Sequence, residues 1–125
     1  MLRLLLIGSG GFIGSVCRYL MSRGVQSLLR DQVLPGGTLS VNVLGCLMAG
    51  LLGGLLESRI VLSVEMQLFF FVGIFGGFTT FSAFGYETYN LLRTGHQLAA
   101  GANMVVQLVL GIGAVCIGHW LARLY

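Results

Sequence analysis

The sequence predicts an all-α membrane protein with four transmembrane helices, the third of them broken near its middle. Of the 125 residues, 56% are hydrophobic and only 9% are charged, whereas soluble domains carry about one quarter charged residues. The charged residues also divide the chain into four uncharged or nearly uncharged segments. Each is long enough to cross a bilayer, which needs about 20 apolar residues. We therefore expect residues 1–125 to form a single four-helix transmembrane domain.

The first expected span, 4–22, lies between Arg3 and Arg23 and contains Arg18. Its apolar start soon gives way to glycines without a clear cleavage site, which favours a retained helix over a signal peptide. The stretch LLLIGSGGFIG (4–14) imitates a dinucleotide-binding glycine loop, but no alternating strand pattern follows it. Helix packing is therefore the better interpretation of these glycines.

Arg18 has two interpretations. The 14 residues of 4–17 make about 21 Å of helix, which is less than the thickness of the hydrocarbon core. Either the helix ends early, or Arg18 lies below the membrane surface, snorkelling outward or facing a water-filled cavity. An interfacial anchor and a positive charge at the mouth of an anion pathway both fit this position.

The second expected span, 36–56, has 21 uncharged residues and follows a proline at a helix-start position. Gly45, Ala49 and Gly53 recur every four residues along it. Such a stripe of small residues is typical of close contact between membrane helices. We expect this stripe to be a packing surface.

Thr38 and Asn42 are also four residues apart, on a different face of the second span. A lone asparagine in a membrane helix commonly hydrogen-bonds a neighbouring helix. Its amide nitrogen can equally donate to an anion, so both interpretations stay open.

The third expected span, 66–86, contains the motif GGFTTFSAF (76–84). Two glycines followed by two threonines form a weak helix, and we expect a break at 76–79. Backbone groups freed at membrane depth persist only if they are buried in protein or line an aqueous cavity. Transporters use such broken helices to offer carbonyls to cations and amides to anions.

Phe81 and Phe84 follow the expected break and share one helix face at spacing i, i+3. A phenylalanine-rich packing stripe explains them simply, but the positive edges of aromatic rings also suit an anion in a dry pore. Glu87 ends the expected span as an interfacial carboxylate. Close to an anion path, it would have to be hydrogen-bonded, paired or neutral.

The fourth expected span, 97–118, has 22 residues between His96 and His119. Both histidines fall at expected helix ends, which favours interfacial over catalytic roles. The sequence contains no nucleophile–base pair, paired carboxylates or metal-ligand spacing, and its three cysteines are typical of small buried hydrophobes. We therefore do not expect an enzyme.

The arginines are balanced between the two faces of the membrane. One face carries Arg3, Arg59 and Arg123, and the other carries Arg23, Arg30 and Arg93, with Arg18 if it reaches the surface. The positive-inside rule therefore predicts almost no preference for one orientation in the membrane. We hypothesise that the chain inserts in both orientations and that two copies pair as an antiparallel homodimer. The arginines are scattered rather than gathered in a patch, which argues against nucleic-acid binding.

Three motifs resemble those of one membrane-protein family. They are GGFIGSVCRY (10–19), GTLSVNVLGCLMAG (37–50) and GIFGGFTTFSAFGYE (73–87). With these motifs, essentially the whole chain resembles the Fluc fluoride channels, also called CrcB. The resemblance implies an antiparallel dual-topology homodimer with two fluoride pores in the bacterial inner membrane. It further implies passive export of fluoride from the cytoplasm and resistance to fluoride, with fluoride, a second copy and the lipid bilayer as partners.

The motif match also implies roles for individual residues. Phe81 and Phe84 would line the pore, Asn42 would be the pore asparagine, and Arg18 would sit at the vestibule. Further polar positions near the pathway match Thr38, Thr80, Ser82 and Glu87. Backbone carbonyls of Gly76 and Thr79 from both subunits would hold a structural Na⁺ at the dimer interface.

The chain departs from the family pattern at three positions. Ala83 stands where the family usually has threonine. Asn103 and Gln107 stand where the fourth span commonly has a tyrosine and a serine. The resemblance therefore does not predict the ion path along this helix.

Two other functions compete with the channel. A small multidrug exporter of the four-helix, dual-topology kind needs a membrane-embedded carboxylate for proton exchange. The acidic residues all fall at expected span ends: Asp31, Glu57, Glu65 and Glu87. A non-conducting or holin-like assembly would explain four apolar helices but not the polar, phenylalanine-spaced break.

Overall fold

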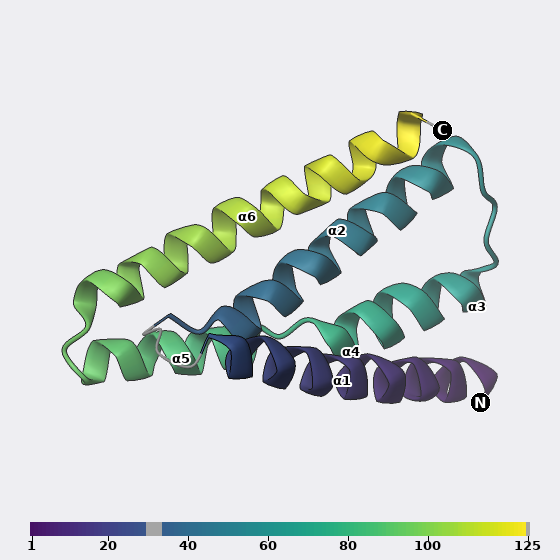
Figure 1. Cartoon of the computed structure of the whole chain (residues 1–125). Coiled ribbons are helices and arrows are strands. Elements are labelled where there is room, and N and C mark those ends of the chain that lie inside the picture. The colour runs from purple at the N-terminus through teal and green to yellow at the C-terminus, as the bar shows by residue number, and fades with distance from the viewer. Residues whose placement is uncertain (30–33, 125) are drawn as a thin grey trace.

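The computed structural model describes residues 1–29 and 34–124, and in this part of the chain the protein is all-helical (Figure 1). Four helical stretches there are long and apolar enough to cross a membrane: Leu2–Leu28, Gly36–Ser58, Val64–Arg93 and Gln97–Leu124. The predicted four-span architecture is confirmed. Arg30 and Asp31, which entered the charge arguments above, lie outside the described residues.

Three of these stretches are single helices: α1 (Leu2–Leu28), α2 (Gly36–Ser58) and α6 (Gln97–Leu124). The third stretch consists of four consecutive segments: α3 (Val64–Gln67), the π-helical η1 (Leu68–Phe75), α4 (Gly76–Phe78) and α5 (Phe81–Arg93). The predicted break in this span is confirmed.

The helices extend further than the expected spans, and this corrects two placements. Glu87 lies inside α5, which continues to Arg93, so it does not end the third span. His119 lies within α6, which continues to Leu124. Helical hydrogen bonds continue past a charged side chain as long as that side chain reaches a partner or water. For this reason, the charged residues and histidines predicted C-terminal ends for these two helices that lie too early in the sequence.

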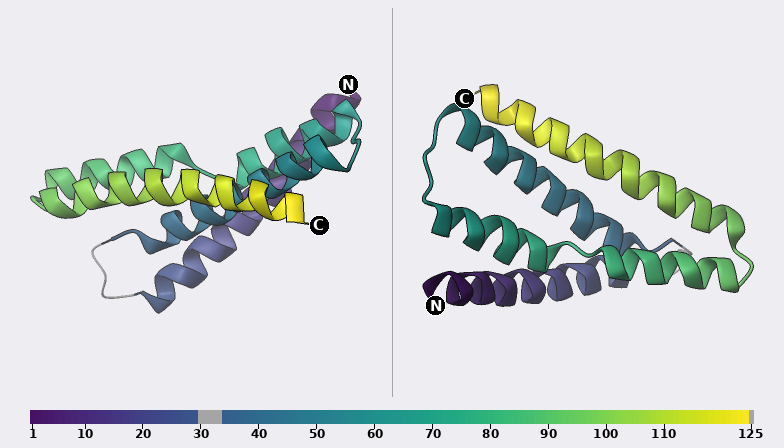
Figure 2. Two further views of the ribbon diagram at one scale, coloured as in Figure 1. Left: turned by 90° about the horizontal axis from the view of Figure 1, so that it is seen from above. Right: turned by 180° about the vertical axis from the view of Figure 1, so that it is seen from behind.

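The helices pack as two pairs that are distant in sequence. α2 lies beside α6, and α1 lies beside η1 and α4 (Figure 1). Within each pair the chains run in the same direction, and both described termini lie at one end of the molecule with the loop after α2 (Figures 1 and 2). Beyond the break, α5 contacts mainly α6 and diverges from α1 (Figure 2).

The contact between α2 and α6 is made through small residues, but not through the whole predicted stripe. Gly45 packs against Phe78 and Thr79, whereas Gly53 has open space around it. A Cβ at Gly50 would collide with the backbone of α6, and a Cβ at Gly118 would collide with the backbone of α2. The close contact therefore lies on a neighbouring face of α2.

The break lies at Thr79 and Thr80, not at the glycine pair. Thr79 has φ −78° and ψ 157°, and Thr80 has φ −149° and ψ 114°, both extended. Gly76 and Gly77 remain helical, and Gly77 instead allows α4 to approach the backbone of Gly11 in α1. The weak helix propensity of glycine is outweighed here by this close helix contact.

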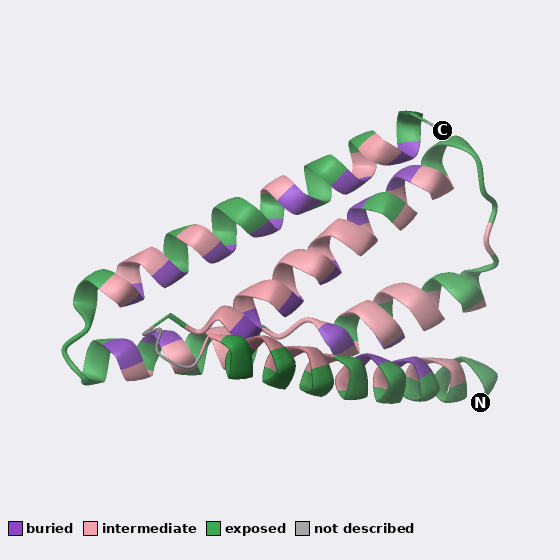
Figure 3. Cartoon of the chain, viewed as in Figure 1, coloured by how far each residue is buried: buried purple, intermediate pink, exposed green. Residues whose placement is uncertain are grey.

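Many large apolar side chains of the described chain are exposed. Figure 3 shows that exposed residues lie along the outer sides of the helices. Val41 is the largest fully buried side chain among these residues. Lipid is as apolar as leucine, so exposed apolar helix faces are stable in a bilayer. A surface of this kind suits a membrane protein.

Candidate functional site

The break in the third span is held open by Asn42 on α2. In a continuous helix the Thr80 amide would donate to the Gly76 carbonyl. Instead, the Thr80 amide donates to Asn42 Oδ1 at 2.8 Å, while Asn42 Nδ2 donates to the Thr80 carbonyl at 3.2 Å. The asparagine side chain thus replaces the backbone partners that Thr80 loses, which satisfies the requirement for paired polar groups inside a membrane protein.

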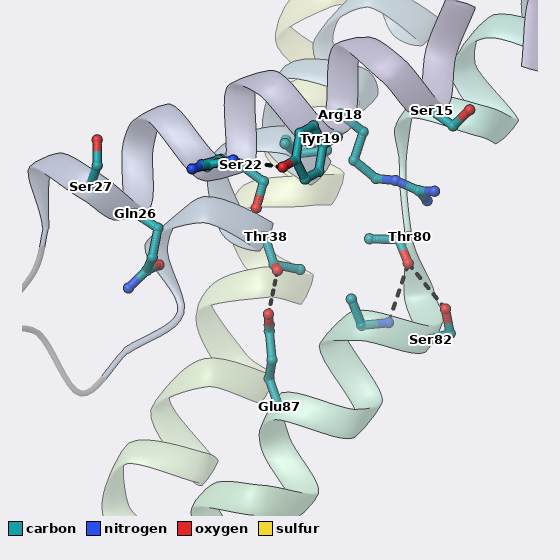
Figure 4. Close-up of a pocket in the computed structure, with 13 residues that line it drawn as sticks. Ser15, Arg18, Tyr19, Ser22, Gln26, Ser27, Thr38, Thr80, Ser82 and Glu87 are labelled. Atoms are coloured by element: carbon teal, nitrogen blue, oxygen red, sulfur yellow. Dashed lines mark hydrogen bonds between the residues drawn. The ribbon is translucent and has the colours of Figure 1, made fainter. Parts of the chain in front are cut away.

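Thr80 also starts the next helix. It is the N-cap of α5, and its Oγ1 accepts a hydrogen bond from the Ala83 amide at 3.2 Å. The same hydroxyl shares a 3.1 Å hydrogen bond with Ser82 Oγ (Figure 4). Threonine is a favourable N-cap residue, so the sequence itself encodes the restart of the helix at Phe81.

Phe81 and Phe84 lie side by side at this restart. Their ring centroids are 5.4 Å apart in an edge-on arrangement, as the i, i+3 spacing predicted. The Phe81 side chain is 80% exposed on the described chain, while Phe84 is partly buried. The chain alone therefore does not cover the Phe81 ring.

A cavity of roughly 930 Å³ opens between the C-terminal half of α1, the start of α2 and the start of α5. Its lining includes five of the predicted site residues: Arg18, Thr38, Thr80, Ser82 and Glu87 (Figure 4). The other predicted residues, Asn42, Phe81, Phe84, Gly76 and Thr79, are not part of this lining. They belong to the break and its immediate neighbours.

The wall that α1 contributes to this cavity is polar, and the sequence analysis missed most of it. Ser15, Arg18, Ser22 and Gln26 all line the cavity. They recur at spacings of three and four residues, so they form one stripe of the helix. That periodicity is visible in the sequence and could have identified the stripe.

Arg18 lies within the continuous α1 helix, so the interpretation that the helix ends early is wrong. Its side chain is partly buried, and Nη1 donates to the Thr79 carbonyl at 3.4 Å. Its guanidinium extends toward the Thr80 side of the cavity (Figure 4). The cavity thus contains a positive charge next to hydroxyl groups, an environment that attracts anions.

Glu87 faces the same cavity from α5. Its side chain points toward Thr38, whose Oγ1 donates to Glu87 Oε1 at 2.6 Å (Figure 4). This hydrogen bond joins the start of α2 to α5. The sequence analysis required Glu87 to be hydrogen-bonded, paired or neutral near an anion path, and the Thr38 hydroxyl supplies the hydrogen bond.

Two buried amides of α6 complete the polar contacts around the break. Gln107 Oε1 accepts from Asn42 Nδ2 at 3.0 Å, and Asn103 Nδ2 donates to Thr88 Oγ1 at 2.9 Å. The sequence analysis left both amides out of the predicted site because they depart from the family pattern. Their four-residue spacing on one helix face was the available signal.

The freed carbonyls at the break have the chemistry of a hard-cation site. The Gly76 carbonyl loses its helical donor, because the Thr80 amide turns to Asn42. Among the described residues, the Thr79 carbonyl accepts only the long 3.4 Å contact from Arg18. Neutral oxygen ligands of this kind suit Na⁺, and unwound carbonyls in transporters bind such ions. The residues present therefore fit the expected ion, although one chain supplies only these two carbonyls.

Comparisons with known proteins agree on one family. Residues 5–119 match the family model described as CrcB-like protein, Camphor Resistance (CrcB). The chain is 42% identical to the fluoride-specific ion channel FluC of Maridesulfovibrio salexigens over 120 residues, which cover 96% of this chain and 94% of that protein. It is 40% identical to the fluoride-specific ion channel FluC of Methylobacillus flagellatus over 124 residues, covering 99% and 97% of the two chains.

Proposed function

The chain belongs to the CrcB family, and we infer that it is a fluoride-selective ion channel. The observation that carries this inference is its identity of 40–42%, over nearly the whole length of both chains, to proteins named fluoride-specific ion channels. It is a multi-pass protein of the bacterial inner membrane and not an enzyme. The interrupted third span, with its polar contacts and adjacent phenylalanine rings, is the part of the fold that suits ion passage.

The chemistry of fluoride suits the groups around the break. Fluoride is small and strongly hydrated, so a pore must replace its water with hydrogen-bond donors at close range. The amides and hydroxyls near Thr80 supply donors, and the edges of Phe81 and Phe84 supply a weaker positive surface. Chloride is larger and more weakly hydrated, and it gains less from such groups.

The direction of flow follows from the membrane potential. A potential of 100 mV, negative inside, drives an anion outward with about 2.3 kcal/mol per charge. Hydrofluoric acid enters cells uncharged and dissociates in the cytoplasm, where fluoride accumulates. A passive channel would therefore export fluoride and give fluoride resistance without an energy source.

The working unit in this proposal is an antiparallel homodimer with dual topology. Two observations support it. The described arginines are balanced between the two ends of the helices: Arg3 starts α1, Arg59 follows α2 and Arg123 ends α6, whereas Arg18 and Arg23 lie in the second half of α1 and Arg93 ends α5. The Phe81 side chain is 80% exposed, and a second copy would cover it. An apolar ring at a pore-lining position needs such cover to exclude water.

A structural Na⁺ at the dimer interface completes the proposal. One chain offers the freed carbonyls of Gly76 and Thr79, and two copies related by a twofold axis would offer four such oxygens. When bound, the ion would attract the carbonyl oxygens of both broken spans and so hold the two copies together. The role of this chain's residues is to present neutral oxygens without adding a carboxylate.

The competing exporter is not favoured. Its exclusion rested partly on the absence of a carboxylate within a span, and Glu87 lies inside α5 rather than at its end. Burial of a carboxylate therefore does not separate the two functions. Family membership does, because the relatives are named as fluoride channels.

Ion efflux from proteoliposomes tests the function directly. Vesicles are loaded with fluoride or chloride, valinomycin is added to release the counter-charge as K⁺, and the external anion is followed with an ion-selective electrode. We expect rapid release of fluoride and no comparable release of chloride. Absence of fluoride release from a folded, dimeric preparation would refute the channel, and proton-coupled export of cationic drugs would then be measured.

A further inference from the structure

Arg18 on α1 connects the cavity with the break in the third span. Its side chain lines the cavity (Figure 4), and Nη1 donates to the Thr79 carbonyl at 3.4 Å. Thr79 itself is not part of the cavity lining. Its carbonyl is one of the two oxygens that the break offers to a hard cation. One positive side chain is thus in contact with both an anion-attracting cavity and a candidate cation site.

The contacts of Thr79 fix the direction of this carbonyl. The Thr79 amide and hydroxyl both donate to the Phe75 carbonyl, at 2.9 Å and 2.8 Å. The Thr79 methyl group fills the space that a Cβ at Gly45 of α2 would need. A β-branched residue is stiff at χ1, and here both branches of the side chain are held. The carbonyl therefore cannot turn away from Arg18 without breaking these contacts.

The Thr79 carbonyl can contact Arg18 and a cation at the same time. A carbonyl oxygen has two lone pairs, and the Arg18 contact uses one of them. Two positive charges on one oxygen repel each other, and this repulsion is about four times stronger near a protein surface than in bulk water. The guanidinium should therefore lower the affinity of the break for Na⁺ without blocking the site.

No carboxylate of residues 1–29 and 34–124 forms an ion pair with Arg18. In this part of the chain, the carboxylates in contact with a basic side chain are Glu57 and Glu65, and neither contacts Arg18. Glu87 lines the same cavity, but its Oε1 accepts from the Thr38 hydroxyl instead. The charge of Arg18 is therefore not balanced by these residues, and a small anion that enters the cavity would balance it.

We propose that Arg18 couples the two ions through the Thr79 carbonyl: its charge weakens Na⁺ binding at the break, and an anion on the guanidinium relieves this repulsion. The proposal rests on the channel and the sodium site proposed above. Because linkage is reciprocal, each ion then raises the affinity of the protein for the other. A dimer whose cavities contain fluoride would therefore retain Na⁺ more tightly than one whose cavities contain only water.

Sodium titrations of dimer melting test this coupling. The apparent dissociation constant of Na⁺ is obtained from the rise of the melting temperature with Na⁺ concentration, in N-methyl-D-glucamine gluconate at constant ionic strength. R18Q keeps a polar side chain but removes the charge, so we expect its constant to be about ten- to a hundredfold lower than that of wild type. R18K keeps the charge, and its constant should stay within about threefold of wild type.

R23Q is the matched control for R18Q. Arg23 lies five residues further along α1, roughly 7.5 Å of helix rise, and it lines the same cavity. Its Nη1 donates to the Tyr19 hydroxyl at 2.7 Å and not to a carbonyl of the break. R23Q removes the same charge from the same helix, so we expect the constant to change by less than about twofold.

The anion dependence of wild type provides a second readout, which does not depend on the folding of any variant. Replacing gluconate by fluoride at constant ionic strength should lower the apparent dissociation constant of Na⁺ about three- to tenfold. R18Q should show no such dependence on the anion. A general stabilising effect of fluoride salts would raise the melting temperature at every Na⁺ concentration and leave the constant unchanged.

The outcomes separate this coupling from the proposals on which it rests. If wild-type vesicles release no fluoride, the channel fails, and if wild-type melting does not respond to Na⁺, the sodium site fails. Either result overturns the coupling as well. If both stand but R18Q binds Na⁺ as wild type does, or R23Q changes as much as R18Q, only the role of Arg18 is overturned. If R18Q does not elute as a folded dimer, wild type decides, and equal constants in fluoride and gluconate overturn the coupling.

Discussion

At the scale of single residues, Asn42 joins the second span to the third by two hydrogen bonds with Thr80, and to the fourth by one with Gln107. In N42D, a carboxylate oxygen would face the Thr80 carbonyl and Gln107 Oε1, both acceptors. Gln107 would rotate its amide to donate to the new charge, which also repels an anion. We expect fluoride efflux to fall about a hundredfold or more, as measured in proteoliposomes.

The control for N42D is Q97E, which also adds one negative charge. Gln97 is exposed at the start of α6, where a negative charge is compatible with the helix dipole. Its efflux should match wild type. Wild-type efflux from N42D would show that Asn42 acts only in packing.

Phe81 is the second residue with a testable role. Replacing its ring by the branched aliphatic side chain in F81I keeps apolar bulk but removes the positive ring edge and the contact with Phe84. Such aromatic interactions contribute about 0.5–1.5 kcal/mol, so we expect a fluoride efflux rate about three- to tenfold lower with an intact dimer. The measurements are efflux and size-exclusion chromatography.

F12I is the matched control for F81I. Phe12 on α1 is 71% exposed, close to the 80% of Phe81, and among the described residues its ring forms no aromatic pair like that of Phe81 with Phe84. Its replacement should change neither efflux nor dimerisation. Equal efflux from F81I and F12I would remove the proposed role of the ring.

At the scale of helices, the pairing of α2 with α6 depends on a few glycines. A Cβ at Gly118 would collide with backbone atoms of Leu47 and Leu51, which cannot move independently of α2. We therefore expect G118A to separate the two helices and to destabilise the fold by about 1–3 kcal/mol. Thermal unfolding of the purified protein in detergent measures this loss.

Gly113 lies on the same helix and has open space around it. G113A should therefore unfold at the wild-type temperature or slightly above it, since alanine favours a helix more than glycine does. Equal melting of G118A and G113A would mean that the contact between α2 and α6 adapts without cost.

At the scale of the whole molecule, the proposed antiparallel dimer requires that neither orientation is strongly favoured by the distribution of charge. Leu28 and Gln97 are exposed at one end, and Val61 and Leu124 are exposed at the other. L28R/Q97R and V61R/L124R should therefore bias insertion in opposite directions under the positive-inside rule. We expect each double variant alone to lose fluoride efflux, and the two expressed together to recover it.

The position of a C-terminal tag in these cells is the accompanying measurement. In wild type the tag should be accessible from both sides of the membrane, and in each double variant from one side only. Full activity of either variant alone, with its tag on one side, would contradict the antiparallel dimer.

A sodium ion shared between two copies would also stabilise the dimer by mass action. A ligand at about 100 times its dissociation constant adds about 2.7 kcal/mol to stability. We expect the dimer to melt at a lower temperature when Na⁺ is replaced by N-methyl-D-glucamine, with recovery when Na⁺ is returned. Identical melting in both buffers would count against the ion.

The sequence alone was enough for the number of helices and for the family. Four uncharged segments predict four spans because the bilayer selects strongly for apolar length. The motif around GGFTTFSAF predicted a break in the third span and the facing pair Phe81 and Phe84, since both follow from local residue spacing. The end of the third span was predicted too early in the sequence. Glu87 can lie inside the helix because it accepts a hydrogen bond from Thr38, 49 positions away in the chain.

Only the tertiary structure decided where the break lies and how its polar groups are used. The glycine pair stays helical because Gly77 contacts α1, and Thr80 leaves the helix because Asn42 captures its amide. In the same contact, Asn42 Nδ2 donates to the Thr80 carbonyl and to Gln107 Oε1, and Gln107 Nε2 has no hydrogen-bond partner among the described residues. Hydrogen-bond partners on different helices are set by packing, which no local pattern in one sequence records.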